Sequence, residues 1–248
     1  MNTETSAVHS NQPLIQHLLE LRTRLLKSLV VTLLFFAGLF YFSSDIYELV
    51  SEPLRMLMPE GTSMIATDVA SPFFAPFKLS LVLALFLAIP FILHQVWGFI
   101  SPGLYKNEKY LAIPLLIASV ILFYAGVAFA YFVVFPLVFG FFTTTGPDSV
   151  TMMTDISSYL NFILKLFLAF GLAFEIPVAT VLLIWSGASS VQSLSQKRPY
   201  IVVGCFVMGM LLTPPDVISQ SLLAGPMWLL FELGLLFARL TPFMKKPS

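Results

Sequence analysis

The sequence has little charge for its length. Of its 248 residues, 10% are charged and 58% are hydrophobic, whereas soluble domains have about 25% charged residues. Such a chain cannot cover a water-facing surface, which argues against a soluble globular protein. It also contains only one cysteine, Cys205. A disulfide framework or a thiolate metal site within one chain is therefore excluded.

Residues for catalysis are equally scarce. The three histidines, His9, His17 and His94, all lie in the first 94 residues, and the sequence has no H-E-x-x-H pair and no G-x-S-x-G turn. We therefore predict no catalytic residue, no metal site and no enzymatic activity. The formal net charge is zero, so we expect no nucleic-acid partner.

What the sequence does contain is long stretches without charge. A helix needs roughly 20 mostly apolar residues to cross the bilayer core. Between Leu166 and Gln196 the only charged residue is Glu175. The stretches without any Lys, Arg, Asp or Glu are 28–44, 79–105, 110–147, 199–215 and 217–231. These stretches predict an all-α integral membrane protein.

The distribution of charge predicts the topology. If 110–147 forms a single span, the chain has six spans, and ten of the 13 basic residues fall on the side of both termini. Splitting this stretch into two spans would place Lys197 and Arg198 outside, against the positive-inside bias. We therefore predict six transmembrane helices with both termini in the cytoplasm.

We treat residues 1–248 as a single polytopic membrane domain. The cytoplasmic segment 1–23 is expected to hold an interfacial amphipathic helix that begins near Pro13, which is a favourable first helical residue. The fifth and sixth spans are expected to be short. The predicted spans are 24–43, 73–97, 111–137, 157–186, 200–212 and 218–238; the predicted periplasmic caps are 44–72 and 139–156, and the predicted cytoplasmic loops are 98–110 and 187–199.

Glu175 is the main functional candidate found by position alone. A carboxyl group within a membrane span is costly, which makes a functional role the default hypothesis. Pro177 lacks a backbone donor and can kink this span. An ion-coupled secondary transporter that uses Glu175 is the alternative function, although the inverted repeat typical of such transporters is not visible. An intramembrane hydrolase lacks a visible nucleophile and base.

Several long stretches resemble one family of membrane proteins. The similarity runs collinearly from about residue 11 to 240, through HLLELRTRLLKS, QVWGFISPGLYKNEKY, AFGLAFEIPV and KRPYIVVGCFVMGMLLTPPDVISQSLLAGP. These segments resemble the TatC family, the core of the twin-arginine translocase. The resemblance implies a concave six-helix bundle that binds twin-arginine signal peptides and helps to export folded proteins.

The resemblance also implies site residues. Glu108 would be the main carboxylate for the signal peptide and Glu20 the second, with Phe99 and Pro102 beside them. Glu175 matches the family's intramembrane acid. The implied contact for the partner subunits comprises Met210, Thr213 and Gln220.

The resemblance further implies partners and a location. The partners are twin-arginine signal peptides of folded cargo and the single-span subunits TatA and TatB, with self-association in the receptor complex. The implied location is the bacterial inner membrane. No cofactor is expected, and export is expected to depend on the proton-motive force.

Overall fold

A computed structural model describes residues 5–57, 65–100, 112–145, 155–213 and 217–240. Within these ranges the chain is helical, apart from an isolated backbone bridge between Ile65 and Asp155. The elements are α1 (Thr5–Phe40), α2 (Ser43–Leu57), α3 (Ser71–Ile100), α4 (Ala112–Phe129), the π-helix η3 (Ala130–Val134), α5 (Phe135–Thr145), α6 (Ile156–Ala173), α7 (Ile176–Trp185), α8 (Val191–Gln196), α9 (Arg198–Leu212) and α10 (Val217–Leu240).

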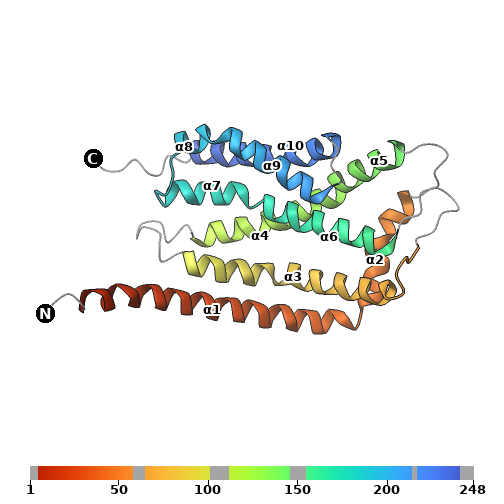
Figure 1. Ribbon diagram of the computed structural model, residues 1–248, viewed down its shortest axis with the longest axis horizontal. Helices are drawn as coiled ribbons and strands as arrows, with labels where there is room; N and C mark the ends of the chain where they lie inside the picture. The colour runs from red at the N-terminus through yellow and green to blue at the C-terminus, as the bar shows by residue number, and fades with distance from the viewer. Residues whose placement is uncertain (1–4, 58–64, 101–111, 146–154, 214–216, 241–248) are drawn as a thin grey trace.

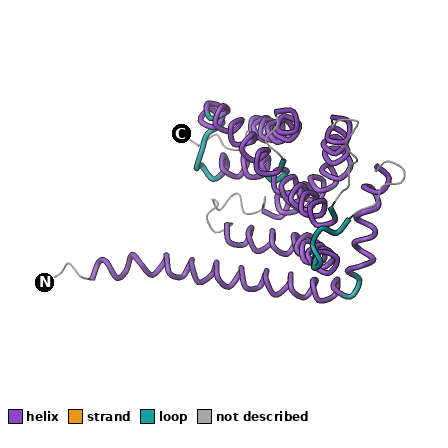
Figure 2. Tube along the Cα trace, turned by 45° about the vertical axis from the view of Figure 1, so that its right-hand side comes forward, coloured by secondary structure: helices purple, strands orange, loops and turns teal. Residues whose placement is uncertain are grey.

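The long helices run roughly alongside one another (Figure 1). Helix α1 lies along α3 at one edge of the bundle, α4 packs on α6, and α10 packs on α7 and α9. The first turn of α1 and the last turn of α10 lie at the same end of the molecule (Figure 1). Figure 2 shows that the N-terminal part of α1 extends beyond the other helices.

The helices have the length and composition of membrane spans. Within the described residues, five helical segments are long and apolar enough to cross a bilayer: Gln16–Phe40, Ser71–Ile100, Ile113–Phe141, Ile156–Trp185 and Val217–Leu240. Helix α1 exposes many large apolar side chains, including Leu25 at 61% and Leu34 at 68%. Contiguous apolar surface on this scale is unfavourable in water, so the chain is a multi-pass membrane protein.

The fifth predicted span is short, as expected, but the sixth is not. Helix α9 has 15 residues, or about 22 Å at 1.5 Å per residue. Helix α10 has 24 residues, or about 36 Å, so the expectation of a short sixth span is wrong. Pro226 does not end α10, because neighbouring packing can compensate for the lost backbone bond.

The expected helix start at Pro13 is also wrong. Helix α1 begins at Thr5 and continues without interruption to Phe40. The sequence between Pro13 and Gly38 contains neither proline nor glycine, so nothing in it separates an N-terminal helix from the first apolar span.

The two long segments predicted as caps both contain helices, and hydrogen bonds between Thr67 and Asp155 connect the two segments. In 44–72, α2 packs on α3. In 139–156, α5 extends to Thr145. Asp155 caps α6 by accepting a hydrogen bond from the Ser158 backbone N–H at 2.9 Å, and it accepts two more from Thr67. These bonds stabilise the ionised carboxylate and lower the pKa of Asp155 to about 2.

Glycine allows α4 to approach α6 closely. A Cβ at Gly126 would lie 2.9 Å from the Phe170 carbonyl carbon, closer still to its oxygen, and 2.9 Å from the Phe174 ring. Because backbone atoms of α6 cannot move aside cheaply, residue 126 has no room for a side chain. The close contact places Phe123, which is 1% exposed, in the main hydrophobic core.

We predict that Gly126→Ala lowers the midpoint of thermal unfolding of the purified protein in detergent. Overpacking of this kind costs about 1–3 kcal/mol. The matched control is Gly204→Ala in α9, where an added Cβ meets nothing within 4 Å and helix propensity favours alanine by up to about 1 kcal/mol. Equal midpoints for the two variants would contradict the packing argument.

Candidate functional site

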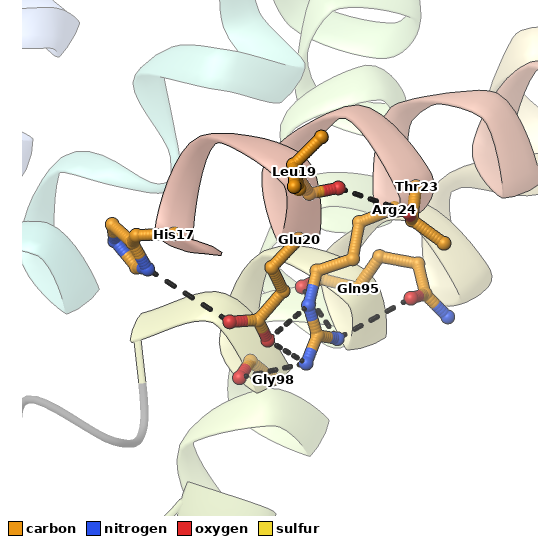
Figure 3. A network of polar contacts seen from close by, with 7 residues as sticks. All are labelled: His17, Leu19, Glu20, Thr23, Arg24, Gln95 and Gly98. Carbon is orange, nitrogen blue, oxygen red and sulfur yellow. Dashed lines mark hydrogen bonds and ion pairs between the residues drawn. The ribbon is translucent and has the colours of Figure 1, made fainter. Parts of the chain in front are cut away.

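A polar network joins α1 to the C-terminal end of α3, at the end of the bundle where α10 also ends (Figure 1). Its centre is an ion pair within α1. The Glu20 Oε1 atom accepts hydrogen bonds from Arg24 Nε at 2.9 Å and from Nη2 at 2.6 Å. The i, i+4 spacing places the two side chains on one face of the helix. Figure 3 shows both pointing toward α3.

Arg24 connects this pair to α3. Its Nη1 donates toward the Gln95 carbonyl at 3.4 Å and the Gln95 Oε1 at 3.3 Å, and its Nη2 donates to the Gly98 carbonyl at 3.1 Å. The Gly98 carbonyl lies in the last turn of α3, where carbonyls have no partner within the helix. A Cβ at Gly98 would clash with the guanidinium. Glycine at this position therefore makes room for Arg24.

The second oxygen of Glu20 is less occupied. Its Oε2 lies 3.8 Å from His17 Nδ1, and within the described residues it accepts no hydrogen bond. The Glu20 side chain is 38% exposed. The imidazole of His17 stacks on Phe99 with a centroid distance of 4.0 Å and an interplanar angle of 12°. The result is an accessible carboxylate oxygen beside an aromatic pair.

This arrangement suits a cationic ligand with donor groups. A carboxylate that accepts from a guanidinium makes short, strong hydrogen bonds, and an aromatic face attracts a cation. Arg24 holds Glu20 through Oε1 and fixes its orientation, whereas Oε2 accepts no hydrogen bond within the described residues and lies 3.8 Å from His17 Nδ1. Arg24 is therefore a positioning residue for Glu20.

The structure brings Glu20 and Phe99 together, as the resemblance implies. Glu108 and Pro102 lie outside the described residues. Sequence reasoning missed the roles of His17, Arg24 and Gly98. The Glu20–Arg24 spacing was readable in the sequence, but the contacts of Arg24 with α3 join residues more than 70 positions apart, and no local pattern reveals them.

Glu175 lies at a break between two helices. Helix α6 ends at Ala173 and α7 begins at Ile176, with Pro177 in its first turn. The helix is therefore interrupted next to Pro177, where the sequence predicts a kink. Ser119 of α4 lies beside the Glu175 carboxyl. Within the described residues, however, neither Glu175 Oε1 nor Ser119 Oγ, both buried, has a hydrogen-bond partner.

The three residues implied as a partner contact lie where α9 ends and α10 begins. Thr213 is the C-cap of α9 and is 6% exposed, and its hydroxyl donates to the Gly209 carbonyl at 3.0 Å. A Cβ at Gly209 would lie 3.2 Å from the Gln220 carbonyl, so the two helices are close here. Met210 is 50% exposed and leaves an apolar contact surface open beside them.

A second arginine–carboxylate pair joins α9 to α10. Arg198 Nε donates to Glu232 Oε1 at 2.6 Å and Nη2 donates to Oε2 at 2.7 Å. Both carboxylate oxygens of Glu232 are therefore engaged, in contrast to Glu20. Sequence reasoning assigned Glu232 no function and did not identify this partner.

The apolar helices define a helical multi-pass membrane protein, and one end of its bundle carries a partly exposed carboxylate, that of Glu20. Comparison with known proteins narrows this class. Residues 16–226 match the family described as Sec-independent protein translocase protein (TatC). The chain belongs to the TatC family.

Individual relatives agree over almost the whole chain. The Sec-independent protein translocase protein TatC of Azotobacter chroococcum is 63% identical over 238 residues, covering 96% of this chain and 93% of the relative. The protein of the same name from Escherichia coli K12 is 58% identical over 94% of this chain and 90% of the relative. A crystal structure of the twin-arginine translocase receptor TatC superposes with a TM-score of 0.82 at 38% identity, covering 90% and 98%.

These matches confirm the resemblance found in the sequence. The family is a protein translocase component and not a family of catalytic enzymes. They give no support to the alternative of an ion-coupled secondary transporter.

We predict that Glu175→Met raises the midpoint of thermal unfolding in detergent. Burying a polar atom without a partner costs about 1–3 kcal/mol, and methionine replaces the carboxyl with an apolar group of similar size. The matched comparison is Glu232→Met, which removes a fully paired carboxylate, leaves Arg198 without its partner and should lower the midpoint. A lower midpoint for Glu175→Met would mean that the carboxyl contributes to stability.

Proposed function

We propose that this chain is the receptor subunit of a twin-arginine translocase, and that it binds signal peptides at the surface formed by Glu20, His17 and Phe99. The observation that supports this most is the state of the Glu20 carboxylate. One oxygen is held by Arg24, while the other is accessible and has only His17 at 3.8 Å. A peptide guanidinium can approach this second oxygen.

One accessible carboxylate is insufficient for selection of two arginines. An exposed ion pair contributes only about 0–1 kcal/mol. We propose that Glu20 and Glu108 each bind one guanidinium, with Phe99 and Pro102 beside them. Arginine has a planar fork of donors that can engage a carboxylate at two atoms, and lysine cannot reproduce this geometry. The site would therefore prefer two arginines over two lysines.

We propose the topology that the charge distribution favours. Helix α9 would be the fifth of six spans in a concave bundle, and both termini would lie in the cytoplasm, as the basic residues suggest. A helix of about 22 Å is shorter than a bilayer core of about 30 Å. The membrane would therefore thin around α9. The location proposed is the bacterial inner membrane.

The junction of α9 and α10 is the proposed contact for TatA and TatB. Apolar Met210 is exposed there beside Thr213 and Gln220, and a single-span helix packs well where polar side chains offer hydrogen bonds within the membrane. We also propose self-association in the receptor complex and export driven by the proton-motive force.

The first test is the affinity of a fluorescent twin-arginine signal peptide for the purified chain in detergent, compared with its twin-lysine counterpart. Glu20→Ala should weaken binding of the arginine peptide about fivefold, since a partly exposed ion pair contributes up to about 1 kcal/mol. Glu108→Ala should remove the preference for arginine.

The matched control for this test is Glu48→Ala, which removes an exposed carboxylate from α2 at the opposite end of the bundle. Its affinity should equal that of the wild type. Unchanged affinity in Glu20→Ala would refute the proposal that Glu20 and Glu108 each bind one guanidinium. Equal binding of the twin-arginine and twin-lysine peptides to the wild type would refute the receptor assignment.

The second test separates Glu175 from the peptide site. Glu175→Gln keeps the size of the side chain but removes its ability to ionise. Because Glu175 lies at the α6–α7 break, away from the α1–α3 network (Figure 1), export of a folded cargo in cells should fall more than peptide affinity. Equal loss of both activities would place Glu175 in the peptide site or in the fold.

A further inference from the structure

A second surface at the same end of the bundle carries positive charge, in contrast to the carboxylate site at Glu20. A pocket of about 270 Å³ lies where α9 begins and α10 ends. Its polar side chains are Arg198, Glu232 and Arg239. Its apolar wall comes from α10 and consists of Leu229, Leu233, Leu235 and Leu236. Neither the peptide site nor the proposed partner contact includes these residues.

The charge of the pocket is positive. Both oxygens of Glu232 accept hydrogen bonds from Arg198, so this pair is neutral overall. Arg239 is exposed and makes no ion pair within the described residues. Arg198 is also the first residue of α9, whose N-terminus has no side-chain cap, and the dipole of a helix adds partial positive charge there. An anion is favoured at this surface and a cation is not.

The apolar wall has the geometry of a lipid chain contact. Leu229, Leu233 and Leu236 follow one another at i, i+4 and i+7, which places them in one stripe along α10. They are 55%, 45% and 49% exposed. Arg239 comes three residues later on the same face, toward the end of the helix. The stripe is thus apolar for about 10 Å and ends at a free cation.

We propose that this pocket binds an anionic phospholipid, with one acyl chain along the leucine stripe and the phosphodiester at Arg239 and the remaining Nη1 of Arg198. Basic pockets between helices at the membrane surface suit such headgroups. A zwitterionic lipid fits less well, because its ammonium group would need a free carboxylate and both oxygens of Glu232 are taken. A twin-arginine peptide would be repelled, so this site is separate from the peptide site.

A groove between α1 and α3 provides a contrast. It is lined by Thr23, Leu26, Lys27, Val30, Val31 and Phe91. It contains a single cation and no paired arginine, so it gives a phosphodiester only one charged partner. Selective binding of an anionic headgroup is therefore expected at the α9–α10 pocket and not here.

The test measures lipid binding to the full chain in detergent by native mass spectrometry. Palmitoyl-oleoyl phosphatidylglycerol is compared with the phosphatidylethanolamine that has the same acyl chains. The wild type should retain phosphatidylglycerol preferentially, and Arg239→Gln should weaken this retention about fivefold, the effect expected for one arginine near a membrane surface. Equal retention of the two lipids by the wild type would overturn the proposal.

Two further variants separate the pocket from general surface charge. Lys197→Gln removes an exposed cation next to Arg198 that does not line the pocket, and it should leave retention unchanged. Glu232→Gln releases Arg198 and adds one net positive charge, so it should raise retention about fivefold, a gain that misfolding cannot imitate.

Three further outcomes would contradict the lipid site. The first is a loss in Lys197→Gln as large as in Arg239→Gln, which would indicate binding by surface charge alone. The second is retention in Glu232→Gln no higher than in the wild type. The third is displacement of the lipid by millimolar inorganic phosphate, which would indicate an anion site that does not need the acyl chain.

Discussion

The structure depends on one constraint: within a bilayer, each backbone N–H and C=O must find its partner inside the protein. Helices satisfy this requirement locally, which is why the described residues are almost entirely helical. Interruptions are expensive and therefore few. Within the membrane-spanning segments they are the π-helix η3 and the step at Phe174–Glu175, where Pro177 opens the backbone. Glu175, whose Oε1 atom is buried, lies at the second of these, so a backbone irregularity and a carboxyl group within the span coincide.

Because the chain has few charged residues, the charged groups at the helix ends determine which ligands can bind there. Two arginine–carboxylate pairs lie at the end of the bundle where α3 and α10 end, and their local geometry gives them opposite properties. Arg24 engages one oxygen of Glu20 and directs its remaining donors to carbonyls of α3. The second oxygen of Glu20 can therefore still accept hydrogen bonds. Arg198 engages both oxygens of Glu232, which leaves only positive charge, on Arg239. The first pair suits a cationic peptide and the second an anionic headgroup.

Packing between helices sets how precisely these groups are placed. Hydrophobic burial provides little drive between helices surrounded by lipid, so close contact depends on small residues. Gly126 lets α4 approach the backbone of α6, Gly98 admits the Arg24 guanidinium, and Gly209 lets α9 approach Gln220. The glycine at each position serves a tertiary contact, and nothing in its immediate sequence indicates this.

The sequence by itself determined the all-helical membrane class, the approximate spans and the kink at Pro177, because apolar length and missing donors are local properties of the chain. Its motifs also indicated the family and, through the resemblance, made Glu20 and Phe99 candidate site residues. Only the tertiary structure decided that Glu20 is held at one oxygen by Arg24, that His17 stacks on Phe99, and that Glu232 is saturated by Arg198. These contacts join distant segments, and their energies depend on the approach of whole helices. The continuous α1 and the full-length α10 likewise depend on packing and on the absence of effective helix breakers.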